Sequence, residues 1–399
     1  MAFDVAWARA AYPALDEGFV HFDGAAGTLV AEPVARAVAG VLRGAVANRT
    51  TAFAPGRRAI QILADARAAV ADLVGGEPGG VVFGPSATAL TYTVARGLAR
   101  TWRPGDNVVV SRLDHDANVR PWVQLAEQTG IQVRWAEFEP STGVLPIQQY
   151  RRIVDDRTRL VAVTAASNAI GTRPDVAAVA AIAHAAGAVL YVDGVHATPH
   201  LPTDIEALGA DFYVTSAYKW SGPHLAACVA APDRWEALAM DKLRPSPDEP
   251  PERFELGTPS WELLAGVTAA VDFLAGLTDA AGSRRERLLA SLAATHEYSA
   301  GLFRDLLAGL RAVPGVTVLP APPDGCPTVS FRIGDQHPAD TAAALGDKGI
   351  CVFSGDYYAY EYFQAMGLRD TGGGVRASIY HYTTAQEIDR LLEAVAGVA

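Results

Sequence analysis

The sequence has few cysteines, no long apolar run and no cluster of basic residues. Its three cysteines, Cys228, Cys326 and Cys351, form neither a disulfide framework nor a metal-ligand cluster, so we expect no metal site. No apolar run reaches the roughly 18 residues that a membrane-spanning helix needs. The first residues also lack the basic segment and apolar core of a signal peptide. These absences predict a cytoplasmic protein without a membrane partner.

The charge balance is acidic, with 33 lysines and arginines against 44 aspartates and glutamates and a formal net charge of −11. Nucleic acids and anionic membrane surfaces attract basic patches, so we expect neither as a partner. The chain has 399 residues, and half of them are hydrophobic. That length and composition predict a globular protein large enough for two packed units.

Two apolar stretches organise the chain, AVLYVDGVHA from Ala188 and DFYVTSAYKWSGP from Asp211. Near-continuous runs of strand-forming residues indicate strands buried on both faces, which is the pattern of a parallel sheet. Asp193 and Lys219 follow these strands, and the spacing of 219 − 193 = 26 residues leaves room for a crossover with a short helix. Ligands of open α/β sheets bind at the carboxyl ends of the strands. We therefore predict an α/β fold with both residues in a ligand site.

A carboxylate and an amine in such a place each need a partner, because desolvating them is costly. Pyridoxal phosphate supplies both partners, since its aldehyde takes a lysine as a Schiff base and a carboxylate can hold its ring nitrogen protonated. Each residue alone has a simpler reading. Asp193 could cap a turn with Gly194, and Lys219 could be a solvated lysine beside Trp220. The pair at neighbouring strand ends favours the cofactor.

These segments resemble the VDGAQA and DFYxxSGHK motifs of the class V aminotransferase family, and specifically its cysteine desulfurase branch. The resemblance extends from HFDGAAGT near the start of the chain to GVRASIYHYTT near its end. It implies the fold of fold-type I enzymes that use pyridoxal phosphate, with a mostly parallel sheet in a large domain and a smaller α+β domain. We place the large domain at residues 21–265 and the small domain at 1–20 and 266–399.

The resemblance also implies which residues bind the cofactor. Ser86, Ala87 and Thr88 fall where a helix is predicted to begin, which suits a phosphate, although an ordinary helix cap uses the same residue types. His115, in DHDAN, matches a histidine that stacks on the pyridine ring and moves protons. The other implied contacts are Asn168 and His196 at the phenolic oxygen, Ser216 and Tyr218 at the phosphate, and Thr258 at the phosphate of a second subunit in a homodimer with shared sites.

The implied substrate is an α-amino acid. Arg376, in GVRAS, matches the arginine that clamps the α-carboxylate, and a guanidinium presents two parallel donors to such a group. Ala26 lies in a small-residue turn that the resemblance places beside the substrate. Arg57, after a polar loop that closes over the site in similar enzymes, is a candidate for an anion contact.

One departure from the family pattern bears on the reaction. A desulfurase needs a mobile cysteine thiolate, which follows a VRxGHHCA pattern in one desulfurase group. This chain reads VFSGDYYA there, with Tyr358 at the cysteine's position, and its three cysteines lie in or beside predicted strands. GDYYA and EYFQAMGL resemble a desulfurase-like subgroup without that cysteine.

We therefore expect a carbon-sulfur β-lyase that converts cysteine or a cysteine S-conjugate to pyruvate, ammonia and a thiol. Lys219 would remove the α-proton, and Tyr357, Tyr358 and Tyr360 would form an aromatic wall for the sulfur substituent or would simply pack together. The alternatives are an aminotransferase, an epimerase, a decarboxylating enzyme or a persulfide-forming desulfurase. A non-catalytic binding module is disfavoured, because the residues of the expected site are retained.

Overall fold

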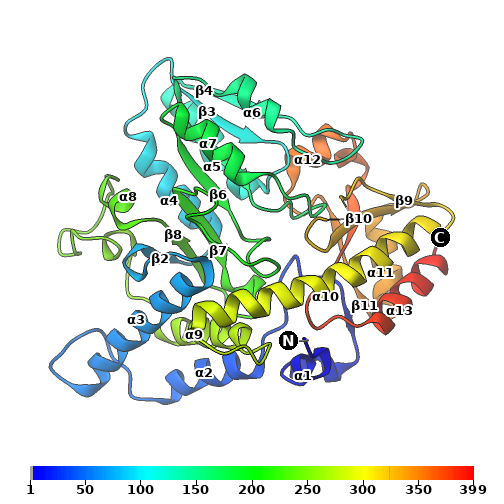
Figure 1. The fold of residues 1–399 in the computed structure, drawn as a ribbon, viewed down its shortest axis with the longest axis horizontal. Coiled ribbons are helices and arrows are strands. Elements are labelled where there is room, and N and C mark those ends of the chain that lie inside the picture. The colour runs from blue at the N-terminus through cyan, green and yellow to red at the C-terminus, as the bar shows by residue number, and fades with distance from the viewer. Residues whose placement is uncertain (1–2, 323) are drawn as a thin grey trace.

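The computed structural model describes residues 3–322 and 324–399, and a seven-stranded sheet lies at its centre (Figure 1). The strand order is β2-β8-β7-β6-β5-β3-β4. The five strands from β7 to β4 run parallel, whereas β8 is antiparallel to both of its neighbours. The strands are β2 (Val81–Gly84), β3 (Asn107–Ser111), β4 (Gln132–Ala136), β5 (Thr158–Thr164), β6 (Val189–Asp193), β7 (Phe212–Ser216) and β8 (Ala226–Val229). The predicted α/β fold with a mostly parallel sheet is confirmed.

A smaller antiparallel sheet has the strand order β12-β13-β10-β9. Its strands are β9 (Val316–Val318), β10 (Thr328–Ile333), β12 (Phe353–Gly355) and β13 (Gly374–Ser378). Near the N-terminus, β1 (Val20–His21) pairs in parallel with β11 (Ile350–Cys351), so the first segment joins the C-terminal part of the chain. The predicted domain boundary after residue 265 falls inside helix α9, and the division into domains stays a prediction.

Helices cover both faces of the large sheet. The helices are α1 (Val5–Arg9), α2 (Glu32–Arg43), α3 (Ala54–Val74), α4 (Ala87–Ala99), α5 (Arg120–Thr129), α6 (Ile147–Ile153), α7 (Val176–Ala185), α8 (Pro232–Glu236), α9 (Trp261–Ala275), α10 (Arg284–Ala312), α11 (Pro338–Gly346), α12 (Tyr360–Ala365) and α13 (Ala385–Ala396). Helix α9 packs against α2, α3 and α10, whereas α4 and α5 contact the strands from the other face. The long α10 runs from this helical layer to the smaller sheet (Figure 1).

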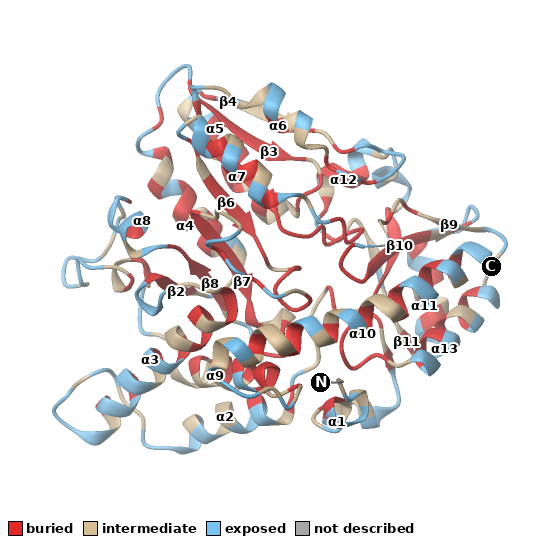
Figure 2. Ribbon diagram, in the orientation of Figure 1, coloured by how far each residue is buried: buried red, intermediate tan, exposed pale blue. Residues whose placement is uncertain are grey.

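The helices on both faces of the large sheet explain why its strands are apolar. Along β6, Leu190 and Val192 enter one core cluster and Tyr191 enters the other, and all three are fully buried. Successive side chains of a strand point to opposite faces, so a strand covered on both sides needs apolar residues at every position. Figure 2 shows these central strands as buried along their length.

The connection from β6 to β7 differs from the prediction. We expected a short helix there, but the described residues between Asp193 and Phe212 form turns and no regular helix. Pro199 and Pro202 explain this difference, because proline has no N–H to donate and its ring clashes with the preceding helical turn. Gly194 is also required beside the site, since a Cβ there would lie 1.9 Å from the ring of Tyr213.

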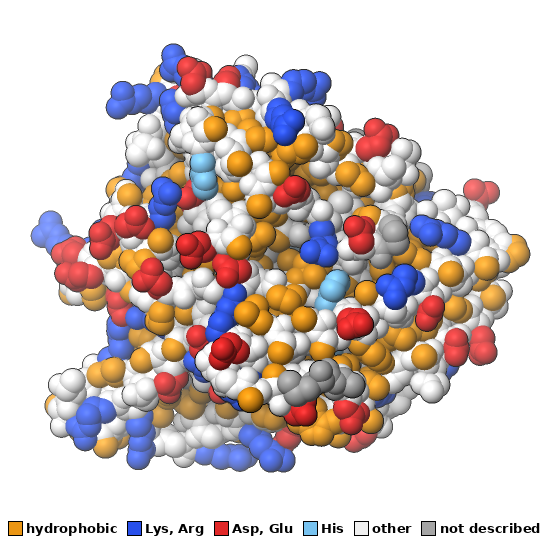
Figure 3. Space-filling model, in the orientation of Figure 1, with side chains coloured by type: hydrophobic (Ala, Val, Ile, Leu, Met, Phe, Trp, Pro, Cys, Tyr) orange, Lys and Arg blue, Asp and Glu red, His pale blue; other side chains and the backbone are white. Residues whose placement is uncertain are grey.

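The surface carries charges of both signs. Acidic and basic side chains are interspersed on the face shown in Figure 3. Within residues 3–322 and 324–399, no helix combines the length and the apolar character needed to cross a membrane.

Candidate functional site

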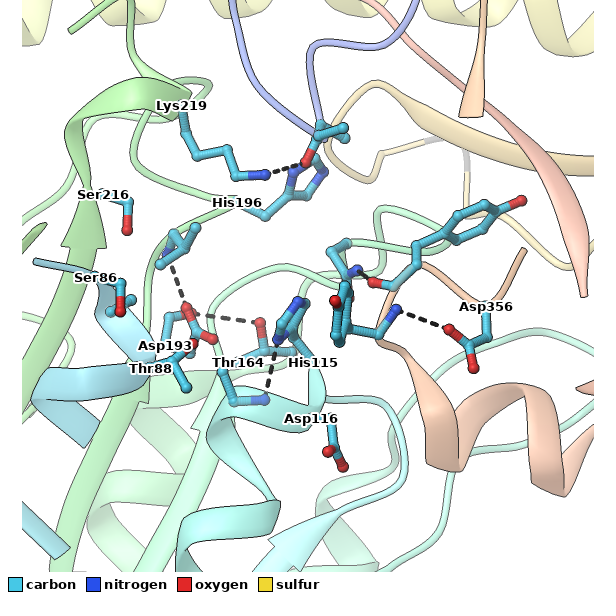
Figure 4. A pocket seen from close by; sticks show the side chains of 18 of the residues that line it. Ser86, Thr88, His115, Asp116, Thr164, Asp193, His196, Ser216, Lys219 and Asp356 are labelled. Carbon is cyan, nitrogen blue, oxygen red and sulfur yellow. Dashed lines mark hydrogen bonds between the residues drawn. The ribbon is translucent and has the colours of Figure 1, made fainter. Parts of the chain in front are cut away.

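Four neighbouring parallel strands end at one cavity. His115 follows β3, Asn168 follows β5, Asp193 is the last residue of β6, and Lys219 lies three residues after β7. Because parallel strands present their carboxyl ends at the same edge, these four side chains meet there. The cavity has a volume of about 670 Å³. Figure 4 shows Lys219, Asp193 and His115 reaching into it from different segments.

The structure brings together all but two of the predicted site residues. The predicted residues that line the cavity are Ala26, Ser86, Ala87, Thr88, His115, Asn168, Asp193, His196, Ser216, Tyr218, Lys219, Tyr358 and Arg376. Arg57 and Thr258 do not line it. Arg57 lies in the first turn of α3, where its side chain is exposed and donates to Thr51 O at 2.8 Å. Thr258 is exposed on the segment before α9 and also lies outside the cavity of its own chain. The ligand contacts expected of these two residues stay predictions.

Lys219 is held at its backbone and at its side chain. Tyr380 Oη donates to Lys219 O at 3.0 Å, and Thr28 N donates to the preceding carbonyl of Tyr218 at 2.9 Å. The amine Nζ donates to Ala25 O. Burial and then the charge of Arg376 lower the pKa of Lys219 to about 7, against the opposing effect of Asp193. A large share of this amine is therefore neutral near pH 7, which is the nucleophilic form.

Asp193 is a buried carboxylate that has one strong protein donor. Its side chain accepts a hydrogen bond from Val195 N at 2.9 Å, and the residue is 6% exposed. Burial raises the pKa of Asp193 to about 6, although the Val195 hydrogen bond and Lys219 lower it. A protonated ring nitrogen beside this carboxylate would favour its charged form.

His115 is neutral at physiological pH. Burial, followed by the positive charges of Lys219 and Arg376, lowers the pKa of His115 to about 3. Its Nδ1 accepts from Ala117 N at 3.0 Å, so the neutral ring carries its proton on Nε2. The imidazole stacks on Tyr358, with ring centroids 5.5 Å apart and planes 25° from parallel.

Arg376 is almost completely buried, at 3% exposure. One of its terminal nitrogens donates to Asn168 O at 2.9 Å, and the guanidinium lies 4.5 Å from the ring centre of Tyr357. Burial lowers the pKa of Arg376 to about 10, which still leaves it cationic at neutral pH. Among the described residues, Arg376 Nε and Asn168 Oδ1 are buried without a hydrogen-bond partner. Buried polar atoms are nearly always paired, so these two atoms indicate where a ligand binds.

The predicted phosphate site lies at the first turn of α4. The helix begins at Ala87, as expected, and Ser86 caps it, with its Oγ accepting from Ala89 N at 3.1 Å. The free N–H groups and positive end of a helix attract an anion. Ser216 and Tyr218 line the same cavity from the lysine segment. His196 lies on another wall, where Nε2 is 3.0 Å from Thr328 Oγ1.

The cavity also contains residues that the sequence interpretation missed. Asp116 and Arg120 line it and form an ion pair at 2.9 Å, and Arg120 also contacts Glu361 at 3.1 Å. The four-residue spacing of Asp116 and Arg120, directly after His115, was the sequence signal that could have indicated these two residues. Phe353 and Asp356 reach the cavity from the small sheet and the loop after it. The available signal was the VFSGDYYA segment, which contains both residues and which the resemblance aligns with the loop of the desulfurase cysteine.

None of the three cysteines is among the described residues that line the cavity. Cys228 and Cys326 are fully buried, and Cys351 is half-buried at the end of β11. Burial raises the pKa of the Cys326 thiol to about 12 and also raises the pKa values of Cys228 and Cys351. All three therefore remain thiols near neutral pH, as expected for packing residues.

A sequence model described as Aminotransferase class-V matches residues 20–391. The chain belongs to the class-V aminotransferase family. An uncharacterized protein of Mycobacterium tuberculosis is 37% identical over 401 residues, and the match covers 100% of both chains. A probable cysteine desulfurase of Pseudomonas aeruginosa is 34% identical over 405 residues, covering 97% of this chain and 96% of that protein.

Solved structures of cysteine desulfurases share the fold of this chain. CsdA from Escherichia coli superposes with a TM-score of 0.88 at 26% identity, covering 99% of this chain and 98% of that one. A desulfurase from Thermococcus onnurineus NA1 gives a TM-score of 0.90 at 25% identity, covering 100% and 98%. The predicted fold-type I architecture is confirmed.

Membership of the class-V aminotransferase family implies pyridoxal phosphate as the cofactor, and the residues present fit that molecule. The cavity offers a lysine with a pKa of about 7, a carboxylate with a raised pKa and a helix N-terminus. The orphaned amide oxygen of Asn168 adds a buried polar atom that a ligand can satisfy.

The low pKa of Lys219 predicts how this protein binds its cofactor covalently. Below pH 7 the amine is mostly protonated and cannot attack an aldehyde, whereas above pH 7 it is mostly neutral. The rate at which cofactor-free protein incorporates pyridoxal phosphate, fixed by borohydride, should therefore rise with a midpoint near 7. Arg376→Gln should move this midpoint upward, because a positive neighbour is lost, whereas Arg311→Gln at the exposed end of α10 should not. A midpoint near the ordinary lysine value of about 10.4 would contradict the prediction.

Proposed function

We propose that this protein is a pyridoxal phosphate-dependent carbon-sulfur β-lyase. Its substrate is cysteine or a cysteine S-conjugate, and its products are pyruvate, ammonia and a thiol. One water is consumed, and no oxidant is needed. The observation that carries the proposal is that Lys219 and Arg376 line one cavity while none of the three cysteines is among the described residues lining it. Elimination needs an acid-base group and a carboxylate clamp but no thiolate.

The cofactor would be held by groups from four strand ends and from α4. Asp193 would hold the ring nitrogen, and Asn168 and His196 would contact the phenolic oxygen. The phosphate would bind to Ser86, Ala87, Thr88, Ser216 and Tyr218. When bound, pyridoxal phosphate supplies the electron sink for a bond broken at the α-carbon. The structural support is that all of these residues line the same cavity.

The chain's own residues perform the remaining tasks. Arg376 binds the α-carboxylate, and Lys219 Nζ takes the α-proton. The neutral imidazole of His115 can pass on a proton through its Nε2–H. The Cβ–S bond then breaks, and sulfur leaves with its electron pair and takes up a proton as the thiol. Hydrolysis of the remaining three-carbon fragment releases ammonia and pyruvate. The pKa of about 7 for Lys219 suits both acceptance and return of a proton near neutral pH.

A persulfide-forming desulfurase is the second candidate, because the Pseudomonas aeruginosa relative and the two similar structures are described as cysteine desulfurases. That reaction requires a thiolate that reaches substrate sulfur. The raised pKa values of Cys228, Cys326 and Cys351 disfavour it in this chain. Transamination, epimerisation and decarboxylation use the same cofactor, and no specific contact in the cavity favours them.

Product analysis separates these reactions. The cofactor-loaded protein is incubated with L-cysteine and with several S-substituted cysteines, and pyruvate, alanine and thiol are quantified. Pyruvate and thiol in equal amounts are expected. Alanine without pyruvate would instead identify sulfur abstraction. A change in the cofactor spectrum without either product would contradict β-elimination and favour another amino-acid reaction.

We also propose a homodimer with shared sites, which would give Thr258 and Arg57 a role at the partner's cavity. Both residues lie outside their own cavity on exposed segments. Chain segments close to these two residues in sequence form a surface hollow. It is lined by Arg49, Thr50, Thr51, Ile60, Leu63, Ala64, Arg67, Pro247 and Glu252. Large apolar side chains are exposed nearby in sequence, at Leu42, Phe53, Leu243 and Leu256. These exposed apolar side chains would gain from burial in an interface between two copies of the chain.

A further inference from the structure

Two consecutive tyrosines at the cavity adopt a backbone conformation that bulky residues rarely take. Tyr357 has φ +51° and Tyr358 has φ +60°. A left-handed conformation is unfavourable for an ordinary residue, because Cβ crowds the following carbonyl. Such residues persist where their surroundings hold them, and they occur preferentially at functional sites.

The surroundings that hold the two tyrosines are specific. Asn168 Nδ2 donates to Tyr357 O at 2.9 Å, and Asp116 N donates to Tyr358 O at 2.7 Å. Tyr358 N donates to Asp356 Oδ1 at 3.0 Å. The loop is thus attached to the segment after β5 and to the segment that carries His115.

The helix that follows this loop is attached to the same part of the large sheet. Glu361, in the first turn of α12, is buried and forms ion pairs with Arg112 at 2.7 Å and with Arg120 at 3.1 Å. A carboxylate paired on both sides is costly to pull apart once it is buried. Both ends of the strained segment are therefore tied to the large sheet.

The conformation sends the two rings in opposite directions. Tyr357 is buried, and its ring lies 4.5 Å from the guanidinium of Arg376. Tyr358 is 72% exposed although its ring lines the cavity and stacks on His115. Phe353 also lines the cavity and is 47% exposed. Tyr360 is not among the lining residues and instead packs between Arg120 and Arg369, so it is not part of the expected aromatic wall.

We propose that Tyr358 and Phe353 bind an aromatic substituent on the substrate's sulfur, so that the substrate class is S-aryl or S-aralkyl cysteine and not free cysteine. The proposal rests on the proposed function, since Arg376 and Lys219 must first orient an amino acid. Two exposed rings that line one cavity present flat apolar surface, and an aromatic group gains both burial and ring packing there. Free cysteine is too short to use that surface, because its thiol ends one atom beyond the β-carbon.

The test compares kcat/KM for S-benzyl-L-cysteine and S-methyl-L-cysteine in the cofactor-loaded protein. The wild-type protein is expected to prefer the benzyl compound by about 10-fold or more. Tyr358→Asn removes the ring and tolerates the left-handed backbone, so it should fold and lose most of this preference through KM. Tyr358→Phe is the matched control and should keep the preference. Phe353→Ala is a second variant, and it should also reduce the preference for the benzyl compound.

A binding measurement tests the aromatic surface without requiring that a carbon-sulfur bond is cleaved. O-Benzyl-L-serine and O-methyl-L-serine lack the sulfur, and their Kd values are measured from the change in the cofactor spectrum. About 10-fold tighter binding of the benzyl ether, lost in Tyr358→Asn, would support the aromatic surface. Equal Kd values in the wild-type protein would overturn it, even if every S-conjugate gave pyruvate. Absence of pyruvate from all conjugates would overturn the proposed function, while a retained preference in binding would still support the aromatic surface.

Discussion

Lys219→Ala is expected to abolish the covalent attachment of pyridoxal phosphate and to reduce turnover by about 10²- to 10⁴-fold, the usual contribution of a general acid-base group. The physical reason is that no second lysine is among the described residues that line the cavity. The chain has three lysines, and Lys242 and Lys348 are not among the residues that line the cavity. After borohydride reduction, mass spectrometry should find the cofactor on the peptide that contains Lys219 in the wild-type protein and on no peptide of the variant.

Lys348→Ala is the matched control, because Lys348 is exposed after α11. This control should label and turn over like the wild-type protein. The thermal unfolding of the cofactor-free variants separates loss of the amine from loss of the fold. A Lys219→Ala protein that still incorporates one reduced cofactor per chain would show that the lysine has been assigned wrongly.

Arg376→Ala should weaken binding of the amino acid by about 1.5–3 kcal/mol, or about 10- to 150-fold in Kd, which is the usual value of hydrogen bonds to a charged group. The guanidinium is 3% exposed, so water cannot easily replace it. Its Nε is buried without a partner among the described residues, which leaves a donor for the carboxylate. The Kd is measured by titrating the cofactor spectrum with a non-reacting amino acid.

The same titration with the corresponding amine, which lacks the carboxylate, tests the assigned role. The wild-type protein should discriminate strongly between the acid and the amine, and Arg376→Ala should discriminate little. The discrimination by Arg376→Lys should lie between those of the wild-type protein and Arg376→Ala. The reason is that an ammonium keeps the charge but not the two parallel donors. Arg311→Ala, at an exposed position on α10, is the control. Unchanged discrimination in Arg376→Ala would mean that another residue binds the carboxylate.

Much of the fold and the site could be predicted from local sequence. The apolar runs that end at Asp193 and Ser216 predicted buried parallel strands, because only a strand covered on both faces needs apolar residues at every position. The end of such strands is where ligands bind, which placed Asp193 and Lys219 in the site. The start of a helix at Ser86 to Thr88 followed from residue type and position, and the structure confirms it, with Ser86 as the cap. The phosphate contact expected there stays a prediction.

Other features depend on segments that are far apart in the chain. Phe353 and Asp356 come from the C-terminal part of the chain, and they line the cavity together with residues that follow the strands of the large sheet. Strand β12 pairs with β13 through Phe353 and Arg376, and the loop after β12 is bonded to Asn168 and to the backbone of Asp116. The absence of a helix between β6 and β7 reflects prolines whose effect the spacing alone did not reveal. Arg57, a candidate for an anion contact, lies in the first turn of α3 with an exposed side chain and does not line the cavity of its own chain.

The sequence by itself determined the class of fold and the chemistry-bearing side chains at the strand ends, because periodicity and residue type act over a few neighbouring positions. Only the tertiary structure decided how those groups affect one another. Burial and the nearby charge of Arg376 lower the pKa of Lys219 to about 7, although the two residues are 157 positions apart (376 − 219 = 157). The direction of the Tyr358 ring likewise depends on hydrogen bonds from distant segments. Desolvation and electrostatic coupling act through space, so no local pattern in the chain encodes them.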